Sequence, residues 1–131
     1  MIGLDTNVVV RYLTQDDPVQ SPIATELIER KLTEANPGYI NVVVMAELAW
    51  VLERVYRLTN AELAAAIERL LQLDAIVVEN EEDVFVAMIA LRAGQGSFAD
   101  ALIAALNTRA GCSHTVTFDR KAPRLPGFAL L

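Results

Sequence analysis

The chain has 131 residues, of which 53% are hydrophobic, and it carries a formal net charge of −6. That length suits one domain with a substantial core, expected here over residues 1–131, and no apolar stretch approaches the roughly 18 residues of a membrane span. The single cysteine, Cys112, excludes an intramolecular disulfide. Without a signal-peptide pattern, we expect a cytoplasmic protein with no membrane contact, whose apolar excess covers a subunit interface.

The first half of the chain alternates strand and helix signals. The expected elements are, in order, a strand over residues 1–4, a helix over 7–14, a helix from 18 to about 34, a turn at 36–38, a strand over 39–41 and a helix over 43–57. The second helix has a clear start, because Asp17 can cap it and Pro18 suits the first helical position.

The second half continues the same alternation. The expected elements are a helix over 60–73, a strand over 75–78, a helix after 80, a break at the GQGS segment, a helix to about 109, a strand over 114–118 and a last edge strand over 128–131. Thr59 and Glu62 have capping-box spacing, and Ser97 with Asp100 suggests another cap. The ENEED run resembles a metal-binding cluster, but acids are favoured in a first helical turn, so we interpret it as a helix start.

Alternating strands and helices are typical of an α/β protein. We therefore predict a three-layer α/β/α sandwich with a mostly parallel central sheet. In this class of fold, ligands bind in the crevice outside the carboxyl ends of the strands. Residues that directly follow a strand are accordingly the first candidates for a functional site.

Four carboxylates stand at positions that local structure explains incompletely. Asp5 directly follows the first strand and Asp119 follows the strand at 114–118, although each could also be a cap or turn residue. Glu47 has valine one turn before it and tryptophan and valine one turn after it, so we expect it on an apolar helix face. Asp100 is similar, with isoleucine and alanine one turn on. A solvated acid normally has polar neighbours at these offsets.

A shared cation would account for all four acids. A lone buried carboxylate is costly unless it is paired, and neither helix places a basic residue one turn from Glu47 or Asp100. Carboxylates about 5 Å apart would repel by roughly 3 kcal/mol per pair at an effective dielectric constant of 20. Oxygen-only ligands favour Mg²⁺ or Mn²⁺, and such ions can generate hydroxide and stabilise an in-line displacement at phosphorus.

The chain resembles the PIN-domain family in four acidic motifs, which occur in the order GLDTNVVVRYL, MAELAWVL, SFADALIAA and TVTFDR. Within that family it is most similar to the VapC-type toxins of bacterial toxin–antitoxin pairs. The resemblance spans nearly the whole chain and implies a parallel-sheet α/β/α fold and a Mg²⁺- or Mn²⁺-dependent ribonuclease. It also implies that Asp5, Glu47, Asp100 and Asp119 form the catalytic quartet, with Asp5 and Asp100 as the most direct metal ligands.

Three further polar residues could support the quartet. Asn7 and Thr6 could hold Asp5 or a phosphate through side-chain hydrogen bonds, although helix capping explains both equally well. Thr117 lies two residues before Asp119 and would share its face if the strand continues that far.

Basic residues gather at the C-terminal end of an otherwise acidic chain. From residue 109 on there are four basic side chains and one acid, Asp119. The net charge of −6 argues at first sight against a nucleic-acid partner, because phosphate backbones are bound by Lys and Arg clusters. The local asymmetry leads us to expect RNA contacts from Arg120, Lys121 and Arg124, with a solvated turn as the alternative.

The leading hypothesis is a toxin ribonuclease in which metal-activated water attacks RNA. By resemblance its partners would be a small antitoxin protein and a second copy of the chain. A second hypothesis is a PIN-like module that has lost catalysis and binds proteins. A third is a small phosphatase with Asp5 as nucleophile. That chemistry usually needs an acid two residues later, where this chain has Asn7.

Overall fold

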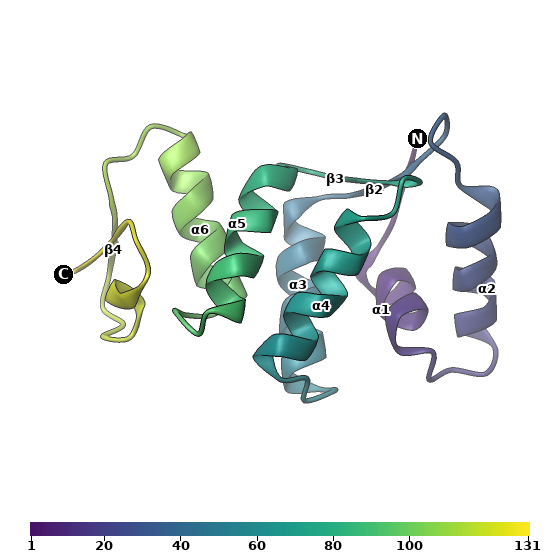
Figure 1. Cartoon of the computed structure of the whole chain (residues 1–131), viewed down its shortest axis with the longest axis horizontal. Coiled ribbons are helices and arrows are strands. Elements are labelled where there is room, and N and C mark those ends of the chain that lie inside the picture. The colour runs from purple at the N-terminus through teal and green to yellow at the C-terminus, as the bar shows by residue number, and fades with distance from the viewer.

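Strands and helices alternate along the whole chain (Figure 1). The computed structural model describes all residues from 1 to 131. The strands are β1 (Ile2–Gly3), β2 (Gly38–Ile40), β3 (Ile76–Val78), β4 (Thr115–Thr117) and β5 (Phe128–Leu130). The helices are α1 (Thr6–Thr14), α2 (Gln20–Glu26) with its π-helical continuation η1 (Leu27–Lys31), α3 (Val42–Arg54), α4 (Asn60–Leu71), α5 (Glu81–Arg92), α6 (Phe98–Arg109) and the short 3-10 helix η2 (Ala122–Arg124). The predicted α/β class is confirmed.

The strands are all parallel, as predicted, but they belong to two separate sheets. β1, β2 and β3 form a three-stranded sheet in that order, with Gly38 opposite Ile2 on one side and Ile76 on the other. β4 and β5 form a two-stranded sheet in which Thr115 pairs with Phe128. The central sheet is therefore divided, and β4 is not paired with β1.

The two sheets lie in different parts of the molecule (Figure 1). α5 packs between α4 and α6, and α6 also contacts α3. β4 and the C-terminus lie beyond α6, at the end of the molecule opposite α1 and α2. The three-stranded sheet and β4 are consequently separated by α5 and α6.

Capping residues set most of the helix starts. Asn41 and Ser97 each accept a hydrogen bond from the backbone N–H three residues on, and Thr59 and Glu62 form the predicted capping box. These side chains satisfy amide groups that have no partner inside the helix. The local signals therefore placed α4 and α6 correctly at their first residues.

The second helix differs from its predicted bounds at both ends. α2 begins at Gln20 rather than at Pro18, although Asp17 still accepts hydrogen bonds from the N–H groups of Val19 at 2.9 Å and Gln20 at 2.7 Å. The helical segment ends with η1 at Lys31 instead of continuing to about residue 34. α3 likewise ends before residue 57, where the backbone turns with a positive φ.

One apolar core of 28 buried residues joins the helices to the three-stranded sheet. The last three acids of the ENEED run, Glu81 to Asp83, begin α5 after Asn80, as predicted, and Asp83 is only 9% exposed. Asp83 pairs with Arg109, so this ion pair ties the start of α5 to the end of α6. None of the helices combines the length and the apolar character that a membrane crossing requires.

Candidate functional site

Two of the four predicted acids, Asp5 and Glu47, line one cavity of about 310 Å³ between α1 and α3. Thr6 and Asn7 line it beside Asp5. The remaining wall comes from Val10, Arg11, Val51, Val55 and Tyr56. The cavity lies where β1 ends and α1 begins, which is the place the fold class predicts for a ligand.

Asp5 caps α1 and also forms part of the cavity wall. Its backbone is extended, at φ −79° and ψ 159°, and its Oδ1 accepts a hydrogen bond from the Thr6 N–H at 2.8 Å. The capping interpretation is thus confirmed. The side chain is exposed and its second oxygen has no protein partner, so that oxygen is free to bind a ligand.

Thr6 carries the single buried side-chain polar atom that lacks a hydrogen-bond partner. The residue is 6% exposed, and the unpaired atom is its hydroxyl Oγ1. Leaving a buried polar group unpaired costs about 1–3 kcal/mol. Thr6 lines the same cavity as Asp5, but its hydroxyl has almost no accessible surface, so a ligand or water could reach it only if the surrounding side chains moved.

Glu47 is exposed, which corrects the expectation that its face of α3 is buried. Val44 is buried at 8% exposure, but Val43 and Trp50 are 71% and 58% exposed. The apolar residues around Glu47 are therefore divided between core and solvent. Glu47 joins the cavity from the solvent side and forms no ion pair.

Asp100 and Asp119 lie outside this cavity. Asp100 is half-buried in the first turn of α6, where its N–H donates to Ser97 Oγ at 3.1 Å. Asp119 is exposed in the turn after β4, and its Oδ1 accepts a hydrogen bond from the Lys121 N–H at 2.9 Å. No group of three or more His, Cys, Asp or Glu side chains is placed to hold one metal ion. A single chain thus brings two of the quartet together and keeps two apart.

Of the predicted supporting residues, some lie at the cavity of Asp5 and Glu47 and one lies beside Asp119. Asn7 is exposed and lines the cavity with Asp5. Thr117 contacts Asp119, but through the backbone, because the Asp119 N–H donates to Thr117 Oγ1 at 3.0 Å. Thr117 therefore shapes the turn that carries Asp119.

Three exposed cationic side chains near the C-terminus have no acidic partner. Arg120, Lys121 and Arg124 form no ion pair. Arg109 is different, because its hydrogen bond and charge attraction with Asp83 raise the pKa of its guanidinium. Arg109 thus belongs to the helix packing, and residues 120–124 remain available to an anionic partner.

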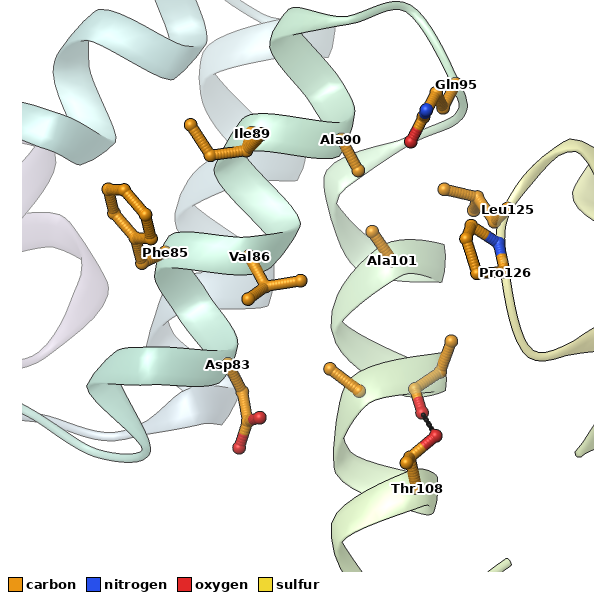
Figure 2. Close-up of a pocket in the computed structure, with 12 residues that line it drawn as sticks. Asp83, Phe85, Val86, Ile89, Ala90, Gln95, Ala101, Thr108, Leu125 and Pro126 are labelled. Atoms are coloured by element: carbon orange, nitrogen blue, oxygen red, sulfur yellow. Dashed lines mark hydrogen bonds between the residues drawn. The ribbon is translucent and has the colours of Figure 1, made fainter. Parts of the chain in front are cut away.

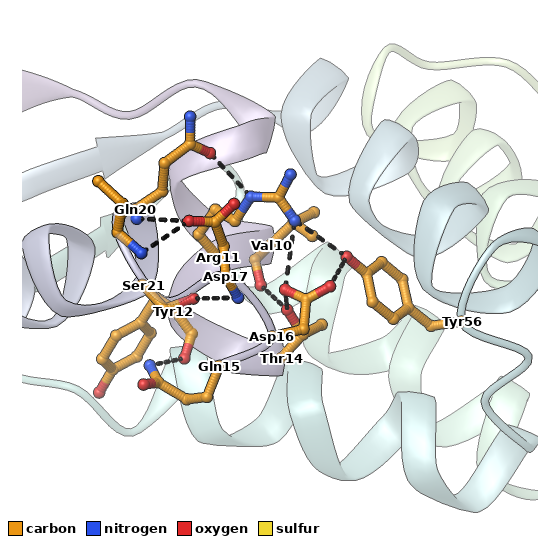
Figure 3. A network of polar contacts seen from close by, with 11 residues as sticks. Val10, Arg11, Tyr12, Thr14, Gln15, Asp16, Asp17, Gln20, Ser21 and Tyr56 are labelled. Carbon is orange, nitrogen blue, oxygen red and sulfur yellow. Dashed lines mark hydrogen bonds and ion pairs between the residues drawn. The ribbon is translucent and has the colours of Figure 1, made fainter.

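Arg11, which also lines the Asp5 cavity, is held by a network of polar groups (Figure 3). Its Nη1 lies 3.2 Å from Asp16 Oδ1. The hydroxyls of Thr14 and Tyr56 each donate to the Asp16 carboxylate at 2.7 Å. These hydrogen bonds, from Thr14 first and Tyr56 second, lower the pKa of Asp16 to about 2. Arg11 therefore pairs with a structural acid and leaves the Asp5 side of the cavity acidic.

The largest cavity of the protein lies elsewhere, between α5, α6 and the Leu125–Pro126 segment (Figure 2). Its volume is about 550 Å³, and its lining is mostly apolar. Asp83 is its only charged lining residue and is already paired with Arg109. This cavity offers no free acid, base or nucleophile, so we do not place the chemistry there.

The sequence-based search passed over one further acid. Glu79 directly follows β3, and its Oε1 accepts a hydrogen bond from the Val42 N–H at 2.9 Å. Burial, together with the adjacent Glu79, raises the pKa of Tyr39. Glu79 meets the same criterion as Asp5, an acid at the end of a strand, but in the sequence it is also the first residue of the ENEED run, whose acids are typical of a helix start.

The family model that matches this chain is the PIN domain, over residues 2–127. The chain belongs to the PIN domain family. PIN domains are generally nucleases that bind RNA and use divalent metal ions. A search of curated proteins found no match for this PIN domain.

The cavity of this PIN domain fits a divalent ion in part. Mg²⁺ typically takes one or two carboxylates and keeps several water ligands. Asp5 and Glu47 supply two carboxylates to the cavity wall, and neither carboxylate is in an ion pair. Asp100 and Asp119, the other two predicted ligands, lie outside this cavity, so they could bind the same ion only if the chains were arranged differently.

Proposed function

We propose that this PIN domain is a Mg²⁺- or Mn²⁺-dependent endoribonuclease that hydrolyses RNA phosphodiester bonds. The observation that carries the proposal is the cavity at the end of β1, which Asp5 and Glu47 line together with Thr6 and Asn7. The family's general nuclease activity supports the reaction class. The proposal covers residues 1–131 as one catalytic domain.

The proposed metal ligands are Asp5, Glu47, Asp100 and Asp119, with Asp5 and Asp100 the most direct. A bound divalent ion would supply hydroxide near neutral pH and neutralise charge that develops at phosphorus. In support of this role, the Thr6 N–H holds one oxygen of Asp5, and the other oxygen has no protein partner.

Polar side chains around the acids would orient the substrate. Asn7, at the start of α1, can donate its side-chain amide to a phosphate oxygen or to Asp5. The unpaired cations Arg120, Lys121 and Arg124 follow Asp119 directly, so a phosphate backbone bound to them would pass close to that acid. The negative charge of the rest of the chain would limit RNA binding to the segment that carries these three cations.

The biological role we propose is that of a VapC-type toxin in a bacterial toxin–antitoxin pair. The support is the similarity of all four acidic motifs to those of such toxins. The proposed partners are a small antitoxin protein that covers the acidic cavity and a second copy of the chain. The proposed place of action is the cytoplasm, where RNA is the substrate.

The test is cleavage of structured RNA by the purified protein with and without Mg²⁺ or Mn²⁺. We expect metal-dependent cleavage that falls at least about a hundredfold in Asp5→Asn and in Asp100→Asn, since each removes a charged ligand. Asp74→Asn is the matched control, because Asp74 is an exposed acid outside the cavity.

Unchanged cleavage in both site variants would contradict the assignment of the acids. Cleavage that survives a chelator would contradict metal dependence. An RNA-inactive protein that hydrolyses a phosphate monoester would instead favour the phosphatase alternative.

A further inference from the structure

Two strands of this protein have an unpaired edge next to an acid of the proposed site. β1 pairs only with β2, and β4 pairs only with β5. An unpaired edge presents backbone N–H and C=O groups that can bind another strand. The faces of β1 are also uncovered, because Ile2 is 45% exposed and a Cβ added at Gly3 would meet no atom within 4 Å.

The β4–β5 sheet is small and exposes apolar side chains. Val116 is 54% exposed, Phe118 is 80% exposed and Leu130 is 52% exposed. A two-stranded sheet is only marginally stable alone, and parallel sheets are normally larger and covered on both faces. The β4 edge therefore has the features of a strand that lacks its neighbour.

The rest of the chain holds β4 away from its own β1. α5 and α6 stand between the two sheets (Figure 1). The short connection 110–114 keeps β4 close to the end of α6, where Asn107 Nδ2 donates to Thr115 Oγ1 at 2.9 Å. A short connecting hinge favours the exchange of an element between copies over closure within one copy.

We propose that two copies of this chain exchange their C-terminal strands, so that β4 of each copy pairs with β1 of the other. The three-stranded sheet of one copy and the two-stranded sheet of the other then form one parallel sheet in the order β3-β2-β1-β4-β5. Because both copies carry both edges, the exchange closes with two-fold symmetry and leaves neither edge unpaired.

The exchange brings a third acid to the site, an assignment that rests on the proposed ribonuclease function. With Gly3 opposite Thr117, Asp5 of one copy and Asp119 of the other follow neighbouring parallel strands at the same edge of the sheet. Each site would take Asp5 and Glu47 from one copy and Asp119 from the second. This explains why a single chain brings together only part of the quartet.

Charge complementarity favours a second copy over an unrelated partner. The cavity side presents the carboxylates Asp5 and Glu47, neither of which is in an ion pair. The exchanged segment carries three unpaired cations at residues 120–124 beside one acid. These cations would come to lie at the rim of the acidic cavity of the other copy, where an RNA backbone must approach.

Crosslinking between different chains tests the exchange. In a Cys112→Ser background, Gly3→Cys and Thr117→Cys chains, whose thiols would lie on the same face of neighbouring strands, are co-refolded in equal amounts and treated with a short bismaleimide. We expect a covalent product of two chains, and a native mass of twice the single chain for the unsubstituted protein by light scattering. Val77→Cys, on the opposite edge of the three-stranded sheet and 41% exposed, replaces Gly3→Cys as the matched control and should give no product.

Three results would overturn the exchange. They are a monomeric native mass, equal crosslinking from Val77→Cys, and an internal crosslink within a chain that carries both Gly3→Cys and Thr117→Cys. Neither mass nor crosslinking depends on RNA cleavage. An exchanged dimer that cuts no RNA would contradict the proposed function alone, and an active monomer would contradict the exchange alone.

Discussion

Asp5 has two roles that a pair of substitutions can separate, capping α1 and binding a metal ion. Asn at a helix N-cap is as favourable as Asp, so Asp5→Asn should keep the hydrogen bond from the Thr6 N–H, now 2.8 Å long. Asp5→Ala removes it. The bond reaches the first helical residue rather than the second or third, so we take the low end of the capping range, about 0.5–1 kcal/mol.

That energy converts to a measurable shift in melting temperature. Unfolding entropy near 60 °C is about 2.1 cal/mol/K per residue, which for this chain gives a loss of about 2–4 °C in Asp5→Ala and about none in Asp5→Asn. Mg²⁺ at ten times its Kd should stabilise the unsubstituted protein by about 1.4 kcal/mol, or roughly 5 °C. Both Asp5 variants should lose most of that gain, whereas Asp74→Asn should keep it.

Thermal unfolding by circular dichroism, with and without Mg²⁺, measures both effects. The capping argument fails if Asp5→Asn melts as low as Asp5→Ala without metal. The metal argument fails if Mg²⁺ raises the melting temperature of Asp5→Asn as much as that of the unsubstituted protein.

Two further predictions concern the framework around the site. The pKa of Asp16 is held at about 2, below its ordinary 3.8, so its contribution to stability is complete above pH 3.8 and is lost as the pH falls toward 2. Between pH 3.8 and pH 2, the melting temperature of Asp16→Asn should fall less steeply with decreasing pH than that of the unsubstituted protein. Identical slopes would contradict the role of the Thr14 and Tyr56 hydroxyls. Gly96→Ala should destabilise by about 1–3 kcal/mol in urea unfolding, because its Cβ would lie 2.6 Å from Cδ1 of the buried Leu125. The same change at Gly3, where a Cβ meets nothing, should cost no stability, and equal losses at both positions would contradict the steric argument.

Features encoded by near neighbours in the chain were predictable from the sequence. The capping box of Thr59 and Glu62, the Ser97 cap and the acidic first turn of α5 all involve residues within one turn of each other. The position of Asp5 at the end of β1 follows from the same local logic. The alternation of strand and helix signals predicted the α/β class, and the family motifs indicated a nuclease.

Features that depend on distant partners were not predictable from the sequence. Apolar neighbours at helical spacing put Glu47 on an apolar face, but they cannot say whether another element covers that face, and here Val43 and Trp50 remain exposed. Arg109 counted as part of the basic C-terminal segment, yet it pairs with Asp83 on the neighbouring helix. Sheet pairing is non-local in the same way, so no local pattern shows that β4 and β1 lie in separate sheets.

The most direct test of the account mixes two inactive variants. Asp5→Asn and Asp119→Asn are each expected to lose metal-dependent RNA cleavage. When the two are co-refolded in equal amounts, about half of the dimers should be mixed, and each mixed dimer has one intact site of two, which restores about a quarter of the unsubstituted activity. One variant carries an affinity tag, so that mixed dimers can be verified by the untagged chain that the tagged chain retains. No recovery of cleavage in a sample with verified mixed dimers would contradict the claim that acids from two copies form one site.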